Sequence, residues 1–205
     1  MKLYYASGAC SLGIHVLLNE VGADYELVKL DMRAGDLQKP EYLAVNPKGK
    51  VPAMMLDDGT ILTEWPALAT YIAATHPQAH LISSDPVIAA RTLEAVMYIN
   101  GTVHLAGFSR VMRPAVFSPN PEEKDAVRMQ GKKIFGDGLA LVSATLADQD
   151  YLMGDFSFAD AALFYVTFWN NAVAKVEAPA NINAHYDRMM ARPAVQRAMV
   201  TEGLA

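Results

Sequence analysis

The single cysteine of this 205-residue chain, Cys10, has the setting that points most directly to chemistry. It follows a short apolar run and the small residues Gly8 and Ala9, and the pattern predicts that a helix begins directly after it. A thiol there faces unpaired N–H groups and the positive end of the helix dipole, and both favour a thiolate. The thiolate could belong to Cys10 or to a bound thiol ligand, while Ser11 could cap the helix or donate to an anion. The alternative is a small buried hydrophobe, because lone cysteines are commonly packed in cores.

Two further segments could hold an extended ligand. Pro52 cannot donate to a sheet ladder, so a cis Val51–Pro52 bond would offer the backbone N–H and C=O of Val51 to a peptide-like ligand. An ordinary trans proline is the alternative. Glu64 is predicted in the first turn of a helix, where an acid complements the helix dipole. It could also bind a ligand ammonium while the helix N–H groups take a carboxylate.

A third group of candidates lies in the second half of the chain. Asn100 and His104 are four residues apart and share one face of a predicted helix, so His104 could serve a site or be purely structural. The other histidines do not cluster with it by spacing, and a metal site has no support. Trp169 ends an apolar run and fits either the core or the lining of a site.

The elements that must position these residues form a small α/β unit in the first part of the chain. Its predicted order is β-α-β-α-β-β-α. The strands are expected over residues 2–5, 25–30, 51–56 and 61–63, and the helices over residues 11–21, 39–45 and 64–75. Asp57-Asp58-Gly59-Thr60 is the strongest hairpin signal.

The second part of the chain predicts only helices. Helix starts are indicated at Asp85-Pro86, at Asn120-Pro121 and at Ser157, where Asp160 completes a pattern similar to a capping box. Arg192-Pro193 should interrupt the last helical stretch. We therefore expect an α/β domain at residues 1–76, a linker at 77–86 and an all-helical domain at 87–205.

Composition limits the classes of protein to which this chain can belong. Apolar residues make up 52% of the chain, which supports a large core, and the net charge of −5 argues against a nucleic-acid binder. No apolar run is long enough for a membrane span, and the first residues do not form a signal peptide. One cysteine excludes a disulfide framework, and a reducing, cytoplasmic compartment fits these features.

Several motifs, spread over almost the whole chain, form a recognisable set. They are Met1-Lys2-Leu3-Tyr4-Tyr5, Gly8-Ala9-Cys10-Ser11-Leu12, Asn46-Pro47-Lys48-Gly49-Lys50-Val51-Pro52-Ala53, Leu56-Asp57-Asp58-Gly59, Leu62-Thr63-Glu64, Phe158-Ala159-Asp160-Ala161, Arg192-Pro193-Ala194-Val195-Gln196 and Glu202-Gly203-Leu204. With these motifs the chain resembles the cytosolic glutathione S-transferase superfamily, most closely its bacterial beta class.

The resemblance implies a thioredoxin-like N-terminal domain that binds glutathione as co-substrate, an all-α C-terminal domain, a homodimer and no metal. It implies catalytic roles for Cys10, Ser11 and His104. It implies a glutathione site made of Cys10, Arg33, Val51, Glu64, Trp65 and His104, and an electrophile site made of Phe108, Met112 and Trp169.

The implied roles follow the parts of glutathione. Cys10 would meet its sulfur, Ser11 would help to hold the thiolate, and Val51 would pair with the cysteinyl backbone. Glu64 and the N–H of Trp65 would hold the γ-glutamyl end. Arg33 would meet the glycine carboxylate, and His104 would approach from the second domain.

The chain departs from the family pattern at three positions. Trp65 stands where the family has Gly or Ser, Met97 where the class has Asn, and Leu105 where it has Lys. Three hypotheses follow. The first is a detoxification enzyme that conjugates glutathione to a hydrophobic electrophile. The second is thiol–disulfide exchange or reductive dehalogenation through a mixed disulfide on Cys10. The third is a binding or regulatory protein without catalysis.

Overall fold

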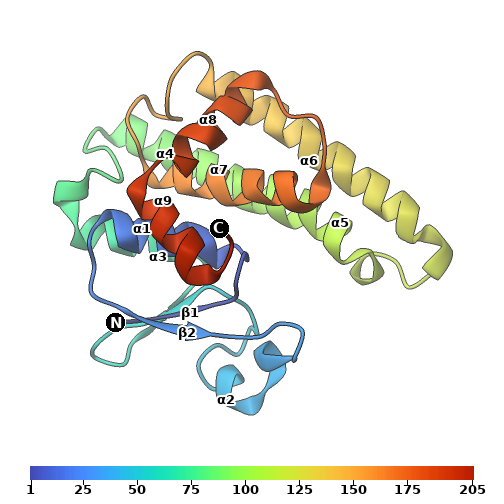
Figure 1. Cartoon of the computed structure of the whole chain (residues 1–205), viewed down its shortest axis with the longest axis horizontal. Helices are drawn as coiled ribbons and strands as arrows, with labels where there is room; N and C mark the ends of the chain where they lie inside the picture. Colours follow the sequence, from blue (N-terminus) through green and yellow to red (C-terminus); the bar gives the residue numbers. More distant parts are fainter. The chain divides into compact units, whose positions relative to one another are not determined.

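The chain forms two compact units in a computed structural model that describes residues 1–205 (Figure 1). The first unit contains Met1–Leu81 together with Met190–Ala205, and the second contains Ile82–Met189. This division differs from the predicted domains at the C-terminus. The physical reason is that the last helix, α9 (Pro193–Glu202), packs on α1 (Ser11–Glu20) rather than on the helices that precede it in sequence.

The first unit is built on a four-stranded sheet with the order β2-β1-β3-β4. The strands are β1 (Lys2–Tyr5), β2 (Glu26–Lys29), β3 (Ala53–Met55) and β4 (Ile61–Thr63). Strand β1 pairs parallel to β2 and antiparallel to β3, and β3 pairs antiparallel to β4. With the helices α1, α2 (Pro40–Leu43) and α3 (Trp65–Thr75), the predicted β-α-β-α-β-β-α order and thioredoxin-like fold are confirmed.

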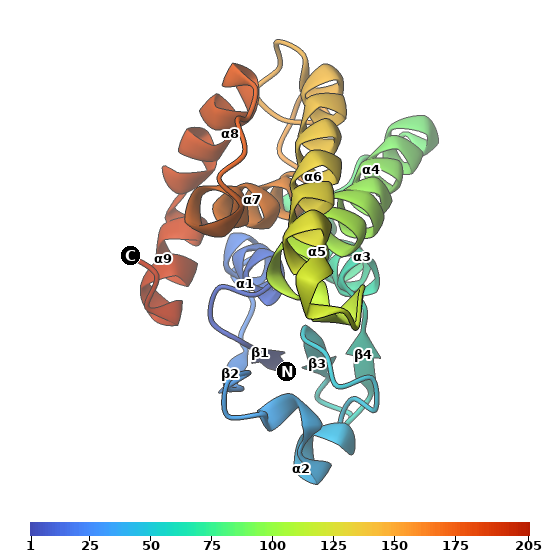
Figure 2. The same ribbon diagram turned by 90° about the vertical axis from the view of Figure 1, so that its right-hand side faces the viewer.

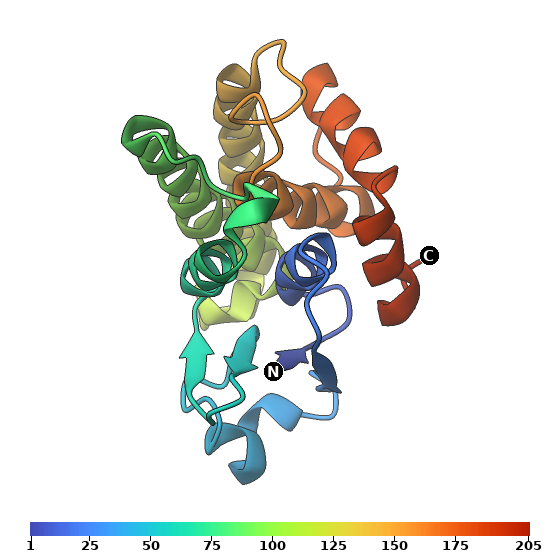
Figure 3. The same ribbon diagram turned by 90° about the vertical axis from the view of Figure 1, so that its left-hand side faces the viewer.

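Helix α1 is the centre of this unit. Helices α1 and α3 lie on one side of the sheet and α2 lies on the other (Figures 2 and 3). Residues 11–18 of α1 are all buried, as expected of a helix covered by other elements on every side. Helix α9 is tied to it by Asn19 Nδ2, which donates to Ala194 O at 3.2 Å, and by the Arg192 guanidinium, which pairs with Glu20 at 2.6 Å.

The regular elements of the second unit are all helices. Helix α4 (Pro86–Tyr98) continues into a π-helical segment, η3 (Ile99–Phe108), and then into α5 (Ser109–Met112). The long helix α6 (Lys124–Leu146), the central helix α7 (Phe158–Trp169), a second π-helical segment η6 (Asn170–Ala174) and α8 (Ala180–Met190) complete it. Short 3₁₀ turns lie at η4 (Pro114–Val116) and η5 (Pro121–Glu123) in this unit, and at η1 (Asp36–Gln38) and η2 (Pro77–Ala79) in the first unit.

Close packing holds η3 in place. Gly107 lies against the backbone of α6, where an added Cβ would stand 3.0 Å from the Phe135 Cα. From the other side, a Cβ on Gly131 of α6 would stand 2.8 Å from the Gly107 carbonyl oxygen. Both positions therefore need glycine for the two helices to approach this closely.

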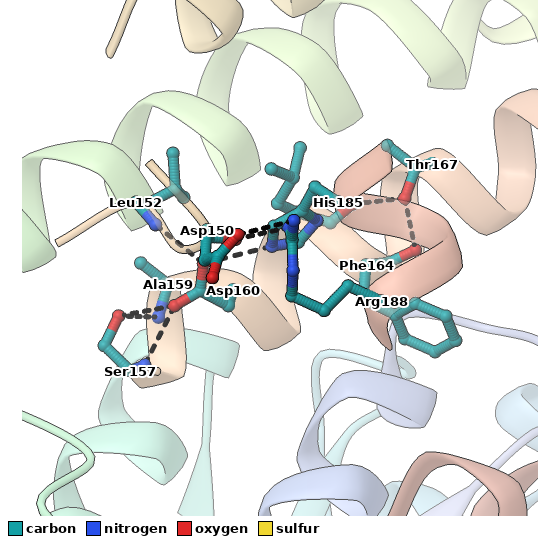
Figure 4. Close-up of polar contacts among 10 residues, drawn as sticks. Asp150, Leu152, Ser157, Ala159, Asp160, Phe164, Thr167, His185 and Arg188 are labelled. Carbon is teal, nitrogen blue, oxygen red and sulfur yellow. Dashed lines mark hydrogen bonds and ion pairs between the residues drawn. The ribbon is translucent and has the colours of Figure 1, made fainter. Parts of the chain in front are cut away.

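The predicted helix starts are confirmed. Asp85 caps α4 by accepting from the N–H groups of Val87 and Ile88. Figure 4 shows the start of α7, where the buried Asp160 carboxylate accepts from Ser157 N at 2.8 Å, from Leu152 N at 2.9 Å and from His185 Nε2 at 3.0 Å. This carboxylate thus joins the start of α7 to the preceding loop and to α8. No helix of the structure combines the length and the apolar content that crossing a membrane requires.

Candidate active site

Cys10 is the N-cap residue of α1 and is partly exposed. Its thiol Sγ lies 3.3 Å from the carbonyl oxygen of Val51, to which it donates. The predicted helix start is therefore confirmed, and the structure brings Cys10 and Val51 together across 41 residues of sequence. A sulfur at this position lies beside the first N–H groups of α1, which favour a negative charge.

The hydroxyl of Ser11 hydrogen-bonds to the backbone of Ala6. Ser11 is fully buried, and its Oγ donates to Ala6 O at 3.2 Å and accepts from Ala6 N at 3.3 Å. The single hydroxyl hydrogen is thus committed to the end of β1, and the predicted side-chain cap of α1 is not formed. In this arrangement Ser11 closes the turn that carries Cys10, and its expected hydrogen bond to a thiolate stays a prediction.

Hydrogen bonds to the preceding residue hold the backbone at Val51 and Pro52 in place. The Val51–Pro52 peptide bond is cis, as the ligand-binding interpretation of this segment requires. Next to it, the Lys50 carbonyl accepts from Tyr42 Oη at 2.5 Å and from Asn46 Nδ2 at 2.7 Å. Burial raises the pKa of Tyr42 to about 12, so this phenol remains a donor at neutral pH. The Tyr42 hydroxyl and the Asn46 amide therefore fix the backbone that leads into Val51.

Glu64 stands at the start of α3 with an unusual backbone. Its φ of 74° and ψ of 124° lie in a region that residues other than glycine rarely adopt. Its carboxylate is 63% exposed and pairs with Lys48 Nζ at 2.5 Å. Strained residues of this kind persist where the surroundings enforce them, and they cluster at functional sites.

Trp65, the departure from the family pattern, turns its indole into the core. The side chain is 3% exposed, and Nε1 donates to the carbonyl oxygen of Cys10 at 3.0 Å. The indole therefore does not lie on the solvent-exposed side of the α3 start. It also links the residue beside Glu64 to the residue that carries the thiol.

Sequence reasoning missed the residues that hold the loop before Cys10. The buried Glu202 carboxylate of α9 accepts from Gly8 N at 2.9 Å and lies 2.9 Å from His15 Nδ1, and Ser7 Oγ donates to the Glu202 carbonyl at 2.5 Å. The motif Glu202-Gly203-Leu204 is typical of the family, but no residue near it in sequence indicates that Glu202 binds the backbone of Gly8.

In the second unit, η3 and α7 bring aromatic side chains together. Phe108 stacks on Trp169 with ring centroids 4.3 Å apart and an interplanar angle of 12°, and His104 meets Trp169 edge-on at 4.7 Å. Tyr165, which the sequence did not indicate, lies 3.3 Å from His104 Nδ1 and donates to Asn100 Oδ1 at 3.0 Å. Asn100 and His104, four residues apart on η3, therefore both lie within hydrogen-bond distance of the Tyr165 hydroxyl.

The remaining predicted positions lie on the surface. Arg33 is exposed in a turn where its backbone N–H donates to Asp31 at 2.8 Å. Met112, at the end of α5, is 51% exposed. Met97 and Leu105, the other departures from the family pattern, are 59% and 49% exposed, so neither is part of the core.

Comparisons with known proteins agree with this architecture. The description "Glutathione S-transferase, N-terminal domain" matches residues 8–75, and "Glutathione S-transferase, C-terminal domain" matches residues 103–193. The glutathione S-transferase GstA of Escherichia coli is 41% identical over 209 residues, which cover 100% of each chain.

Solved structures give the same result. A glutathione transferase homologue from Sulfitobacter, solved with bound glutathione, superposes with a TM-score of 0.92 at 33% identity, covering 100% of this chain and 98% of the other. The beta class enzyme of Sphingomonas chungbukensis superposes with a TM-score of 0.83 at 33% identity, covering 100% of both chains. With its sheet order, its Val51–Pro52 edge and these full-length matches, the chain belongs to the glutathione S-transferase family.

Proposed function

We propose that this protein transfers the thiolate of glutathione to a hydrophobic electrophile. The observation that carries the proposal is the contact of Cys10 Sγ with the Val51 carbonyl at 3.3 Å. This contact supports the proposal because a helix start, which favours a thiolate, then lies beside backbone of the kind to which an extended peptide can add. The family membership, the relative named a glutathione S-transferase and the Sulfitobacter structure with bound glutathione support the same reaction.

Each part of glutathione has a proposed partner in the first unit. The cysteinyl backbone pairs with Val51, and the sulfur lies at Cys10, where the α1 dipole favours the thiolate. The γ-glutamyl ammonium pairs with Glu64, while the N–H of Trp65 at the α3 start takes the adjacent carboxylate. Arg33 is the proposed cation for the glycine carboxylate.

The second unit supplies the remaining proposed residues. Phe108 and Trp169 form a stacked wall, with Met112 at the end of α5, and this surface suits a planar apolar electrophile. His104 is proposed to act in the reaction.

Cys10 supports a second reaction at the same site. As a partly exposed thiol at a helix N-terminus, it can form a mixed disulfide with glutathione and carry out thiol–disulfide exchange. Mass spectrometry after treatment with oxidised glutathione tests this reaction. An adduct of glutathione mass on Cys10 supports exchange, and unmodified protein contradicts it.

The transferase reaction is tested by binding and by turnover. Calorimetric titration should detect glutathione, and chlorodinitrobenzene should be conjugated at a saturating rate. Glu64→Gln should weaken glutathione binding about tenfold, because a charge-assisted hydrogen bond to the ammonium is lost. Glu122→Gln, the same change at an exposed glutamate of η5, is the matched control and should leave binding unchanged. Absence of binding heat and of conjugation would refute the proposal.

We also propose a cytoplasmic homodimer. Helix α4 exposes the apolar side chains of Val87 at 67%, Ile88 at 41% and Met97 at 59%, and the neighbouring pair Val87 and Ile88 is proposed to be covered by the second copy of the chain. The lone thiol of Cys10 suits a reducing compartment. Sedimentation equilibrium should give twice the chain mass, and Val87→Lys should shift it toward the monomer.

A further inference from the structure

A chain of hydrogen bonds inside the second unit ends on His104. Asn100 Nδ2 donates to the Val96 carbonyl at 3.0 Å. Tyr165 Oη lies 3.0 Å from Asn100 Oδ1 and 3.3 Å from His104 Nδ1. Asn100 and His104 lie on η3, and Tyr165 lies on α7.

The direction of each hydrogen bond is fixed by the first one. A backbone carbonyl only accepts, so the NH₂ group of Asn100 faces Val96 and its Oδ1 faces Tyr165. That oxygen also only accepts, so it receives the single hydroxyl hydrogen of Tyr165. The Tyr165 oxygen can then only accept from His104, and the hydrogen between them must be carried by His104 Nδ1.

The neutral imidazole of His104 is therefore held in one tautomer, with its hydrogen on Nδ1 and a lone pair on Nε2. Tyr165 is fully buried, so water does not compete for its hydroxyl. Edge-on ring contacts with Tyr165 at 5.8 Å and Trp169 at 4.7 Å fix the plane of the imidazole.

We propose that Asn100 and Tyr165 are positioning residues that hold His104 in the Nδ1–H tautomer, so that Nε2 is the nitrogen that gains and loses a proton during the reaction. This inference rests on the proposed function, in which the thiol of glutathione releases its proton and keeps the electron pair of the S–H bond on sulfur. The released proton is taken up by the lone pair of Nε2, which forms the new N–H bond. His104 becomes an imidazolium that still donates Nδ1–H to Tyr165, and Nε2 later releases its proton to the leaving group or to water.

The tautomer can be observed directly by two-bond ¹⁵N–¹H correlation NMR on protein with labelled histidine, at a pH where His104 is neutral. His104→Gln identifies the His104 signal among those of the five histidines. The wild-type protein should show a protonated Nδ1 and an unprotonated Nε2. A wild-type His104 protonated at Nε2 would overturn the inference.

Three variants test the order of donors and acceptors in this series of hydrogen bonds. In Asn100→Leu, Tyr165 loses its acceptor and should donate to His104 Nδ1, which moves the histidine hydrogen to Nε2. In Tyr165→Phe the constraint disappears, and both tautomers should be populated. The double variant should behave as Tyr165→Phe does, because Asn100 acts only through Tyr165.

The matched control is Tyr186→Phe, which removes the same hydroxyl from a tyrosine stacked on Phe164 of α7. It should leave the His104 tautomer unchanged. If Tyr165→Phe does not fold, the nearly isosteric Asn100→Leu still decides the question, and an unchanged tautomer in that variant would refute the inference.

Turnover separates this inference from the proposed function. Asn100→Leu should lower kcat at least tenfold while the Kd for glutathione changes much less, because the proposed glutathione partners Val51, Glu64 and Trp65 are untouched. Failure of the wild-type protein to bind glutathione refutes the proposed function, whereas the tautomers are measured without ligand. An inverted tautomer with unchanged kcat would refute the role of Nε2 in the reaction.

Discussion

Trp65 is one of the three residues at which this chain departs from the expected family pattern, and the structure shows where its side chain lies. Its indole is buried and donates to the Cys10 carbonyl at 3.0 Å, so a large side chain occupies the core instead of the ligand side of the α3 start. The same hydrogen bond connects two ends of the proposed glutathione site. Trp65 thereby couples the conformation of the thiol-bearing residue to the start of α3.

We predict that Trp65→Phe lowers the free energy of unfolding by about 1–2 kcal/mol, because one buried hydrogen bond and some packing are lost. The Kd for glutathione should rise in the same variant, since the Cys10 peptide is held less firmly. Urea denaturation and calorimetric titration measure the two effects. Trp169→Phe, at the tryptophan of the second unit, should leave the Kd nearly unchanged. Equal changes of Kd in both variants would contradict the coupling.

At the scale of elements, the start of α7 depends on one carboxylate. Asp160 is fully buried and accepts from Leu152 N, Ser157 N, Ser157 Oγ and His185 Nε2 (Figure 4). Three of these donors belong to the loop before α7, and the fourth belongs to α8. The carboxylate therefore orients the helix that carries Tyr165 and Trp169.

We predict that two substitutions in this cap, Asp160→Ala and Ser157→Ala, lower the free energy of unfolding by very different amounts. Asp160→Ala should cost about 3–5 kcal/mol of unfolding free energy, because several buried N–H groups lose their acceptor. Ser157→Ala removes only the hydroxyl of the capping box and should cost about 1 kcal/mol. Chemical denaturation of both variants measures the difference. Similar losses would show that the cap hydroxyl, and not the buried carboxylate, dominates.

The segment before β3 gives a pH-dependent prediction. Burial raises the pKa of Tyr42 to about 12, while the unfolded chain keeps the ordinary value of about 10. Between these values the folded state binds more protons than the unfolded state, so the free energy of unfolding should fall as the pH rises through this window. Tyr42→Phe should reduce the fall.

Two denaturation series, one at a pH of about 9 and one at a pH of about 11, test this dependence. Tyr42→Phe also removes the hydrogen bond to Lys50 and should be less stable at both pH values. The difference between the two pH values is therefore the diagnostic quantity. Burial also raises the pKa of Tyr25 to about 12, so part of the dependence should remain. An unchanged difference in Tyr42→Phe would contradict the assignment.

The helices and strands could be predicted from the sequence because each is indicated by residues that are close together in the chain. Strand alternation, the hairpin at Asp57-Asp58-Gly59-Thr60 and the caps at Asp85 and Ser157 each involve a few neighbouring residues. The direction of the Trp65 indole and the Asn100–Tyr165 contact depend on partners 55 and 65 residues away. Such contacts have no periodicity, so a single sequence does not reveal them.

At the scale of the whole molecule, the C-terminal segment of the chain packs against the N-terminal segment within the first unit. Its last helix, α9, belongs to the first unit and places Glu202 beside His15 and the loop before Cys10, 187 residues away from His15 in sequence. Each unit also contains one tryptophan, Trp65 in the first and Trp169 in the second. The unfolding of the two units can therefore be followed separately by fluorescence.

Glu202 should stabilise the first unit in particular. Its carboxylate is buried, and Glu202→Ala would leave Gly8 N and His15 Nδ1 without their acceptor. We expect a loss of about 3–5 kcal/mol in the transition reported by Trp65, measured in a Trp169→Phe background. Val200→Ala, at a 68% exposed position of the same helix, is the matched control and should change it by less than about 0.5 kcal/mol. In the reverse background, Trp169 should report a smaller loss, because no atom of the second unit accepts or donates in these hydrogen bonds. A larger loss at Trp169 than at Trp65 would mean that α9 stabilises the helical unit more than the unit that carries the thiol.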